Sequence, residues 1–122
     1  MKLNHLDLQV RDVGATANFF QHYFGLRVRS NPGSDAIAIL TDDDGFVLVL
    51  QRSDAGETYP KDCHVGFLVD DVEVVRSLHK RATDEGATVS DVIVNGRGTM
   101  IYFSAPEGYR IEVSCQRKRF NA

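Results

Sequence analysis

Apolar and polar residues alternate over residues 5 to 10, HLDLQV, which predicts a strand with one buried and one polar face. From residue 13 to residue 24 the apolar residues, many of them aromatic, recur at helical spacing and are predicted to pack in the core. Asp12 stands at the N-cap position of this helix, and Gly25 is expected to end it. Further strands are predicted at 26–30, 36–41 and 46–52, joined by turns rich in Asp and Gly and followed by a polar linker at 52–62.

The second half of the chain repeats this order. HVGFLVDDV (64–72) matches HLDLQVRDV (5–13) at an offset of 59 residues, 64 minus 5. IYFSAPEGYRIEV (101–113) matches AILTDDDGFVLVL (38–50) at an offset of 63, 108 minus 45. A repeat of half the chain length indicates one supersecondary unit used twice. The elements predicted for the second copy are a strand at 63–69, a helix at 72–85 between Asp71 and Gly86, and strands at 88–94, 99–104 and 109–115.

The repeat predicts an α+β fold of two tandem βαβββ modules, residues 1–58 with the linker and residues 59–122, which together form one domain. The length of 122 residues and the apolar content of 43% are enough to bury a core. A net charge of −3 gives no basic face for nucleic acid, and no apolar run approaches the roughly 20 residues that span a membrane. The start of the chain resembles a strand rather than a signal peptide, which favours a cytoplasmic location.

Two smaller features follow from the composition. Cys63 and Cys115 are expected to be buried, reduced thiols in a cytoplasmic protein. A basic cluster, residues 117–119, is interpreted either as a solvated tail or as an anion clamp that folds over a bound ligand. His22 and His79 lie on predicted helices, and we expect both at the surface without a functional role.

Strand parity places polar residues of both copies on the faces that do not meet a helix. In the second copy His64 lies opposite apolar neighbours, and Glu112 lies opposite Ile111 and Val113. We expect this face to line a cavity. The equivalent face of the first copy carries His5, Asp7, Gln9, Ile39, Val49 and Gln51, and the counterpart of Ile39 in the second copy is Tyr102.

Two imidazoles and one carboxylate, from His5, His64 and Glu112, make a facial ligand set for a divalent Fe, Mn, Ni, Co or Zn ion. Such an ion polarises a bound oxygen or chelates two adjacent oxygens. Glu112 lies in an apolar strand, where an unpaired carboxylate is costly. A metal ion would satisfy it, and so would an ion pair with Arg110 or the basic tail. Asp7 is a further candidate to replace one of the three ligands.

These residues make the chain resemble the vicinal oxygen chelate superfamily of glyoxalase I, extradiol dioxygenases, fosfomycin-resistance transferases and bleomycin-resistance proteins. The resemblance runs from NHLDLQVRD and FFQHYFGLRV to HVGFLVDD and APEGYRIEV. It implies an open, eight-stranded, barrel-like mixed sheet around a metal ion, with helices outside. It also implies a homodimer whose sites draw on both chains, so that His5 acts with the partner's His64 and Glu112.

The resemblance does not select a subfamily. Glyoxalase I carries an acidic ligand, which is also its proton shuttle, where this chain has Val49. The His, His, Glu set is closer to the transferases and the dioxygenases, and Tyr102 falls where the transferases place a substrate-binding tyrosine. The residues after Glu112 differ from the transferases' tail, and the dioxygenases commonly have a longer chain with additional histidine and tyrosine residues.

Two main interpretations remain. The first is a metal-dependent lyase, transferase or dioxygenase that activates a small oxygen-rich molecule by bidentate chelation, with Glu112 as ligand and catalytic residue. Its candidate substrate-binding residues are Asp7, Ile39, Val49, Gln51, Met100, Tyr102 and Arg110.

The alternative is a metal-free dimeric protein of the bleomycin-resistance type that binds an antibiotic or another aromatic ligand. Its clefts would be lined by Ile39, Val49, Met100 and Tyr102. A scaffold domain with a vestigial site is a third interpretation. All three ligand-type residues are retained, which favours the enzyme because a binder does not need them.

Overall fold

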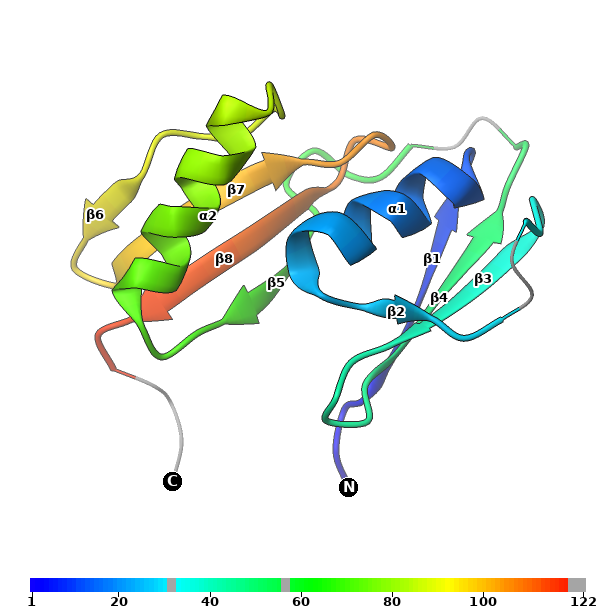
Figure 1. Ribbon diagram of the computed structural model, residues 1–122, viewed down its shortest axis with the longest axis horizontal. Helices are drawn as coiled ribbons and strands as arrows, with labels where there is room; N and C mark the ends of the chain where they lie inside the picture. Colours follow the sequence, from blue (N-terminus) through cyan, green and yellow to red (C-terminus); the bar gives the residue numbers. More distant parts are fainter. Residues whose placement is uncertain (31–32, 56–57, 119–122) are drawn as a thin grey trace. The chain divides into compact units, whose positions relative to one another are not determined.

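The computed structural model describes residues 1–30, 33–55 and 58–118. The chain forms two compact units, Met1–Glu57 and Thr58–Ala122, and each contains one helix and four strands in the order β, α, β, β, β (Figure 1). The α+β class and the two βαβββ modules predicted from the sequence are therefore confirmed. The turn residues 31–32, the linker residues 56–57 and Arg119 of the basic cluster lie outside the described residues.

The first unit is a four-stranded mixed sheet with one helix. Its strand order is β1-β4-β3-β2, with β1 parallel to β4 and the other pairs antiparallel. The elements are β1 (His5–Val10), α1 (Val13–Phe24), β2 (Arg27–Val28), β3 (Ile37–Thr41) and β4 (Val47–Arg52).

The second unit has the same architecture. Its strand order is β5-β8-β7-β6, with β5 parallel to β8 and the other pairs antiparallel. The identical order and pairing confirm the repeat found in the sequence. The elements are β5 (His64–Leu68), α2 (Val72–Asp84), β6 (Ile93–Asn95), β7 (Gly98–Ser104) and β8 (Arg110–Gln116).

Helix α1 begins and ends at the predicted residues, whereas α2 begins at Val72 as predicted and ends at Asp84, one residue before the predicted end. The Asp12 carboxylate accepts a hydrogen bond from the backbone N–H of Ala15, and Asp71 caps α2 in the same way. Gly25 and Gly86 follow the helices with φ values of 69° and 77°, a conformation that glycine adopts without strain. Neither helix in the described part of the chain is long and apolar enough to cross a membrane.

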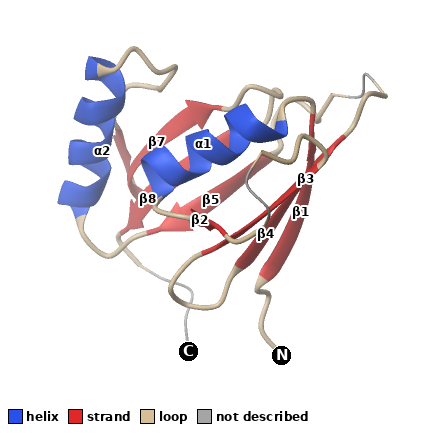
Figure 2. Ribbon diagram, turned by 45° about the vertical axis from the view of Figure 1, so that its right-hand side comes forward, coloured by secondary structure: helices blue, strands red, loops and turns tan. Residues whose placement is uncertain are grey.

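Each helix packs on one face of its own sheet, α1 against β3 and β4 and α2 against β7 and β8. The two helices are drawn in blue in Figure 2. Among the aromatic residues of α1 only Phe20 is fully buried, and the others are half-buried and stack edge-on around it. His22 is exposed on α1, as predicted, whereas His79 is half-buried on α2. The buried strand residues on the helix side are Leu8, Val10, Ala38, Leu40, Leu48 and Leu50 in the first unit, and Ile101, Phe103, Ile111 and Val113 in the second.

The predicted strand at 88–94 is wrong in extent. Only an isolated bridge from Val89 to Phe103 precedes β6, which begins at Ile93. The Ser90 hydroxyl accepts the backbone N–H of Tyr102 at 3.0 Å and donates to a neighbouring carbonyl. It takes the place of one ladder hydrogen bond, whereas the Ser90 N–H still donates to the Tyr102 carbonyl oxygen at 2.8 Å. The predicted strand at 26–30 likewise shortens to the two residues of β2.

Cys63 and Cys115 are free and half-buried. Cys63 lies just before β5, and Cys115 lies near the end of β8. Because these strands are parallel and pair from His64 beside Arg110, the two thiols lie at opposite ends of the strand pair. A disulfide within the chain would require the sheet to be rebuilt.

Candidate metal and substrate site

A row of three residues crosses the second sheet on the face opposite α2. Strand pairing places Gly66 of β5 beside Glu112 of β8, and Glu112 beside Tyr102 of β7. The residues that flank Glu112 in the chain, Ile111 and Val113, are buried on the helix side. Glu112 itself is half-buried, so its carboxylate lies on the polar face that parity predicted.

The Glu112 carboxylate is held by a phenol. The Tyr102 hydroxyl donates to Glu112 Oε1 at 2.5 Å, and this bond is the main cause that raises the pKa of Tyr102 above its ordinary value, with burial adding to it. Arg97 acts in the opposite direction on the same pKa. The sequence also allowed an ion pair between Glu112 and Arg110, but Arg110 is paired with Asp62 at 3.6 Å.

We expect Tyr102 to ionise above the roughly pH 10 of a free phenol. Because the folded state favours the neutral phenol, its contribution to stability is complete below pH 10 and is lost as pH rises through the higher native pKa. The measurement is a phenolate absorbance titration of wild type minus Tyr102→Phe, which isolates one of the four tyrosines. In a Glu112→Gln background the isolated titration should move to lower pH, and an unchanged titration would contradict the assignment.

Two guanidinium groups flank this pair. The guanidinium carbon of Arg110 lies 4.9 Å from the centroid of the Tyr102 ring, within cation–π distance. The Nε atom of Arg110 is buried and has no hydrogen-bond partner among the described residues. Arg97 contacts the sulfur of Met100 at 3.6 Å, and the Tyr102 hydroxyl lies 3.8 Å from the same sulfur. The two guanidinium groups place positive charge beside the Tyr102–Glu112 pair.

Both candidate histidines hold one ring nitrogen against the backbone. Nδ1 of His64 lies 3.0 Å from the carbonyl oxygen of Asp62, and Nδ1 of His5 lies 3.1 Å from that of Val47. A carbonyl oxygen can only accept a hydrogen bond, so Nδ1 of each histidine is the nitrogen that carries the proton. In the neutral ring the lone pair of Nε2 is then free to bind a ligand. Metal-ligating histidines in proteins usually have such a partner on the other nitrogen. Each of the two histidines therefore presents Nε2 as an available ligand atom for a divalent metal ion.

The equivalent row of the first sheet is largely aliphatic. Asp7 of β1 lies beside Val49 of β4, and Val49 lies beside Ile39 of β3. Val49 and Ile39 are half-buried, whereas Asp7 and Gln51 are exposed on the same face. His5 precedes Asp7 by two residues, so both side chains leave the same side of β1.

The predicted site residues thus form one set in each unit. Within residues 1–30, 33–55 and 58–118, no three His, Cys, Asp or Glu side chains are grouped closely enough to hold a metal ion. Each polar face carries one of the proposed imidazoles and one carboxylate. The first set is His5, Asp7, Ile39, Val49 and Gln51, and the second is His64, Met100, Tyr102, Arg110 and Glu112.

The sequence analysis did not identify Arg97 and Asp62, because neither lies in a predicted strand. The alternation of side chains between the two faces of a strand does not apply to residues in turns. The sequence also placed Met100 in the lining of the cavity, whereas Met100 is 1% exposed and lies beneath Arg97 and Tyr102. The side-chain hydrogen bond of Arg97 to the sulfur shows that Met100 supports this cluster.

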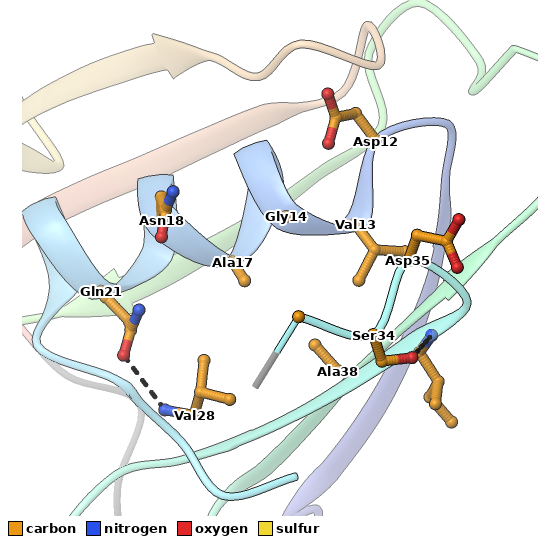
Figure 3. A pocket seen from close by; sticks show the side chains of 12 residues that line it. Asp12, Val13, Gly14, Ala17, Asn18, Gln21, Val28, Ser34, Asp35 and Ala38 are labelled. Atoms are coloured by element: carbon orange, nitrogen blue, oxygen red, sulfur yellow. Dashed lines mark hydrogen bonds between the residues drawn. The ribbon is translucent and has the colours of Figure 1, made fainter. Parts of the chain in front are cut away.

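A pocket of about 590 Å³ lies on the other side of the first sheet, between α1 and residues 33–38 (Figure 3). Its lining includes Val13 and Ala17 of α1 and Ala38 of β3, and the Gln21 side chain closes one end by accepting the backbone N–H of Val28. The pocket is on the helix side of the sheet, so it is separate from His5 and Asp7.

Comparison with known proteins gives a consistent result. A family model described as Glyoxalase/Bleomycin resistance protein/Dioxygenase superfamily matches residues 2–113. The sequence matches no curated protein. A solved structure of a possible glyoxalase from Bacillus cereus is 36% identical, with a TM-score of 0.84 over 94% of this chain and 99% of that chain.

Two more distant structures share the fold. A fosfomycin resistance protein from Listeria monocytogenes is 20% identical, with a TM-score of 0.76 over 94% of this chain and 93% of that chain. A lactoylglutathione lyase from Agrobacterium tumefaciens is also 20% identical, with a TM-score of 0.73 over 93% and 92% of the two chains. At this identity the likeness concerns the fold alone.

Proposed function

Because the chain belongs to the glyoxalase/bleomycin resistance protein/dioxygenase superfamily, we propose that it is a metal-dependent enzyme that activates a small, oxygen-rich molecule. The observation that carries this proposal is that each histidine has Nδ1 against a backbone carbonyl oxygen, which leaves Nε2 for a ligand. The carbonyl belongs to Val47 of the paired strand for His5, and to Asp62 of the preceding segment for His64. The two histidines stand at equivalent positions of the repeat, the first residue of β1 and the first residue of β5.

His5, His64 and Glu112 are the residues that would hold the ion, with His5 acting in a homodimer with the partner's His64 and Glu112. A bound divalent Fe, Mn, Ni, Co or Zn ion supplies Lewis-acid stabilisation of negative charge on a substrate oxygen. In this proposal Tyr102 fixes the Glu112 carboxylate through Oε1 and leaves the other oxygen free.

The remaining residues of the site bind and orient the substrate. Arg110, with its guanidinium over the Tyr102 ring, is positioned to bind an anionic oxygen of the substrate, and Arg97 adds a second positive charge. Ile39 and Val49 offer half-buried aliphatic surface to the less polar part. Gln51, exposed beside them, is a candidate hydrogen-bonding group. We therefore favour a substrate with a carboxylate, phosphate or phosphonate next to a carbonyl or hydroxyl group.

A metal-free binding protein is the second candidate, and one observation favours it. On the polar face of the first sheet, Val49 and Ile39 stand at the positions that Glu112 and Tyr102 occupy in the second sheet. Half of the candidate surface is therefore suited to an apolar or aromatic ligand. An antibiotic-binding protein of this superfamily would use such a surface without metal chemistry.

Metal content separates the two candidates. The protein is purified without an affinity tag or a chelator and analysed by inductively coupled plasma mass spectrometry, then stripped and titrated with each candidate ion. Near-stoichiometric binding of one ion supports the enzyme. No binding of any ion after stripping would overturn it and would direct the work to screens for antibiotic binding.

A further inference from the structure

The turn between β6 and β7 contains an asparagine that is followed directly by a glycine. Asn95 is the one asparagine of the chain that precedes a glycine. It ends β6 opposite Gly98, the first residue of β7, so Gly96 and Arg97 form a connection of two residues. All three residues from Asn95 to Arg97 are exposed. The Asn95 side chain and the peptide that follows it are therefore both accessible to water.

The backbone nitrogen of Gly96 is free to react with the Asn95 side chain. Its N–H donates no hydrogen bond to any residue that the structure describes. Oδ1 of Asn95 accepts the backbone N–H of Arg97 at 2.9 Å. The ring that this hydrogen bond closes includes the Gly96 nitrogen, so the bond holds the side-chain amide toward that peptide and polarises its carbonyl. Apart from the chain neighbours, no heavy atom lies within 4 Å of a Cβ built at Gly96, so the approach is not hindered.

We propose that Asn95 is a site of spontaneous deamidation. The Gly96 nitrogen loses its proton to a base in solution and attacks Cγ of Asn95. The bond between Cγ and Nδ2 breaks, and Nδ2 leaves as ammonia after it takes a proton from water, so that a cyclic succinimide remains. Water then opens this ring at one of its two carbonyl carbons. The products are aspartate, with the original backbone, and isoaspartate, in which the backbone runs through Cβ and Cγ.

Deamidation changes the surroundings of the Tyr102–Glu112 pair through Arg97. The Arg97 guanidinium contacts the sulfur of Met100 at 3.6 Å and acts on the Tyr102 hydroxyl. Both products place a carboxylate two residues before Arg97. The new negative charge attracts the exposed guanidinium and draws it away from Met100 and Tyr102.

Isoaspartate has a second effect, on the hairpin of β6 and β7. It lengthens the backbone at Asn95, which pairs with Gly98. Gly98 cannot shift toward β8, since a Cβ at Gly98 would already lie 2.2 Å from the carbonyl oxygen of Cys115. We therefore expect β6, rather than β7, to move when isoaspartate forms.

Peptide mapping by mass spectrometry tests the site. The folded wild-type protein is kept in mildly alkaline buffer, digested at intervals and analysed for aspartate and isoaspartate. We expect progressive conversion at Asn95 and little at Asn18, which is also exposed but is followed by an N–H within helix α1. Conversion at Asn95 that is no faster than at Asn18 would overturn the proposal, and so would conversion in urea but not in the folded protein.

The Gly96→Ala variant tests the attacking nitrogen. The added methyl group hinders approach of this nitrogen to Cγ of Asn95, so we expect conversion to slow several-fold. Circular dichroism checks that the variant is folded. An unchanged rate in the folded variant would show that the reaction does not pass through the Gly96 nitrogen and would overturn the proposed step.

The Asn95→Asp variant carries the aspartate product in every molecule and tests the link to Tyr102. Arg97 lowers the pKa of Tyr102, so withdrawal of Arg97 should move the phenolate titration of Tyr102 to higher pH. Glu112 and Arg110, the other charged groups beside Tyr102, are the same in this variant. In an Arg97→Gln background the substitution should have a smaller effect. A titration equal to that of wild type would overturn the link between the turn and Tyr102.

Discussion

The Gly98→Ala variant is expected to lose about 3 kcal/mol or more of unfolding free energy. Gly98 opens β7 with a φ of 146°, which L side chains rarely adopt. A Cβ added there would lie 2.2 Å from the carbonyl oxygen of Cys115 and 2.9 Å from the Cα of Gln116. Both contacts are backbone atoms of the neighbouring strand, so relief requires separation of β7 from β8. Urea unfolding followed by circular dichroism measures the loss.

Gly96→Ala is the matched control, since Gly96 lies two residues earlier in the same turn. No heavy atom lies within 4 Å of the Cβ it would gain, and its φ is not in the left-handed region. We expect a change within about 0.5 kcal/mol. Equal losses in the two variants would show that turn flexibility, rather than the approach of β8, determines the effect.

The second large effect is expected on metal binding. Under the proposed ligand set, Glu112→Gln and His64→Ala should each reduce the metal content of the purified protein from near one ion per chain to a small fraction. Glu112→Gln keeps an oxygen that can accept the Tyr102 hydroxyl, so it tests the charge of the carboxylate rather than the packing of β8. Plasma mass spectrometry and calorimetry with the native ion provide the readouts.

His22→Ala and Glu73→Gln provide the controls for these two variants. Both residues are exposed and lie on the helices, and neither variant should change the metal content. Retention of metal in Glu112→Gln or His64→Ala, with the fold intact, would show that the ligand set is wrong.

The identity of the ion in the wild-type protein selects the activity assay. Iron points to oxygen chemistry, and Mn, Ni or Zn points to isomerase or transferase chemistry.

The sequence predicted most of the fold because two independent signals agree along the chain. Alternation in β1, β5 and β8 assigned the faces of these strands, and the buried residues Leu8, Ile111 and Val113 confirm the assignment. The repeat assigned the strands that alternation alone left ambiguous. Capping by Asp12 and Asp71 was recognisable because a carboxylate before a helical pattern has one common use.

The contacts that prepare the site could not be predicted in the same way. The Ser90 hydroxyl replaces one backbone hydrogen bond of the predicted strand at 88–94, and nothing in a serine's sequence position reveals this. The orientation of His5 and His64 depends on backbone carbonyls, which are present at every residue and leave no sequence signal. Arg97 reaches Tyr102 from a turn, where neither strand nor helix periodicity applies.

The separation of the two faces of each sheet has a consequence for how this protein could evolve. The buried leucines and isoleucines that pack on α1 and α2 alternate with the residues of the polar rows, so a change such as glutamate to valine in a row leaves the helix-facing core untouched. A single mutation in a row can thus change the chemistry of that face while the packing of the sheet on its helix is kept, provided that a new charged group has a partner such as Tyr102 has for Glu112.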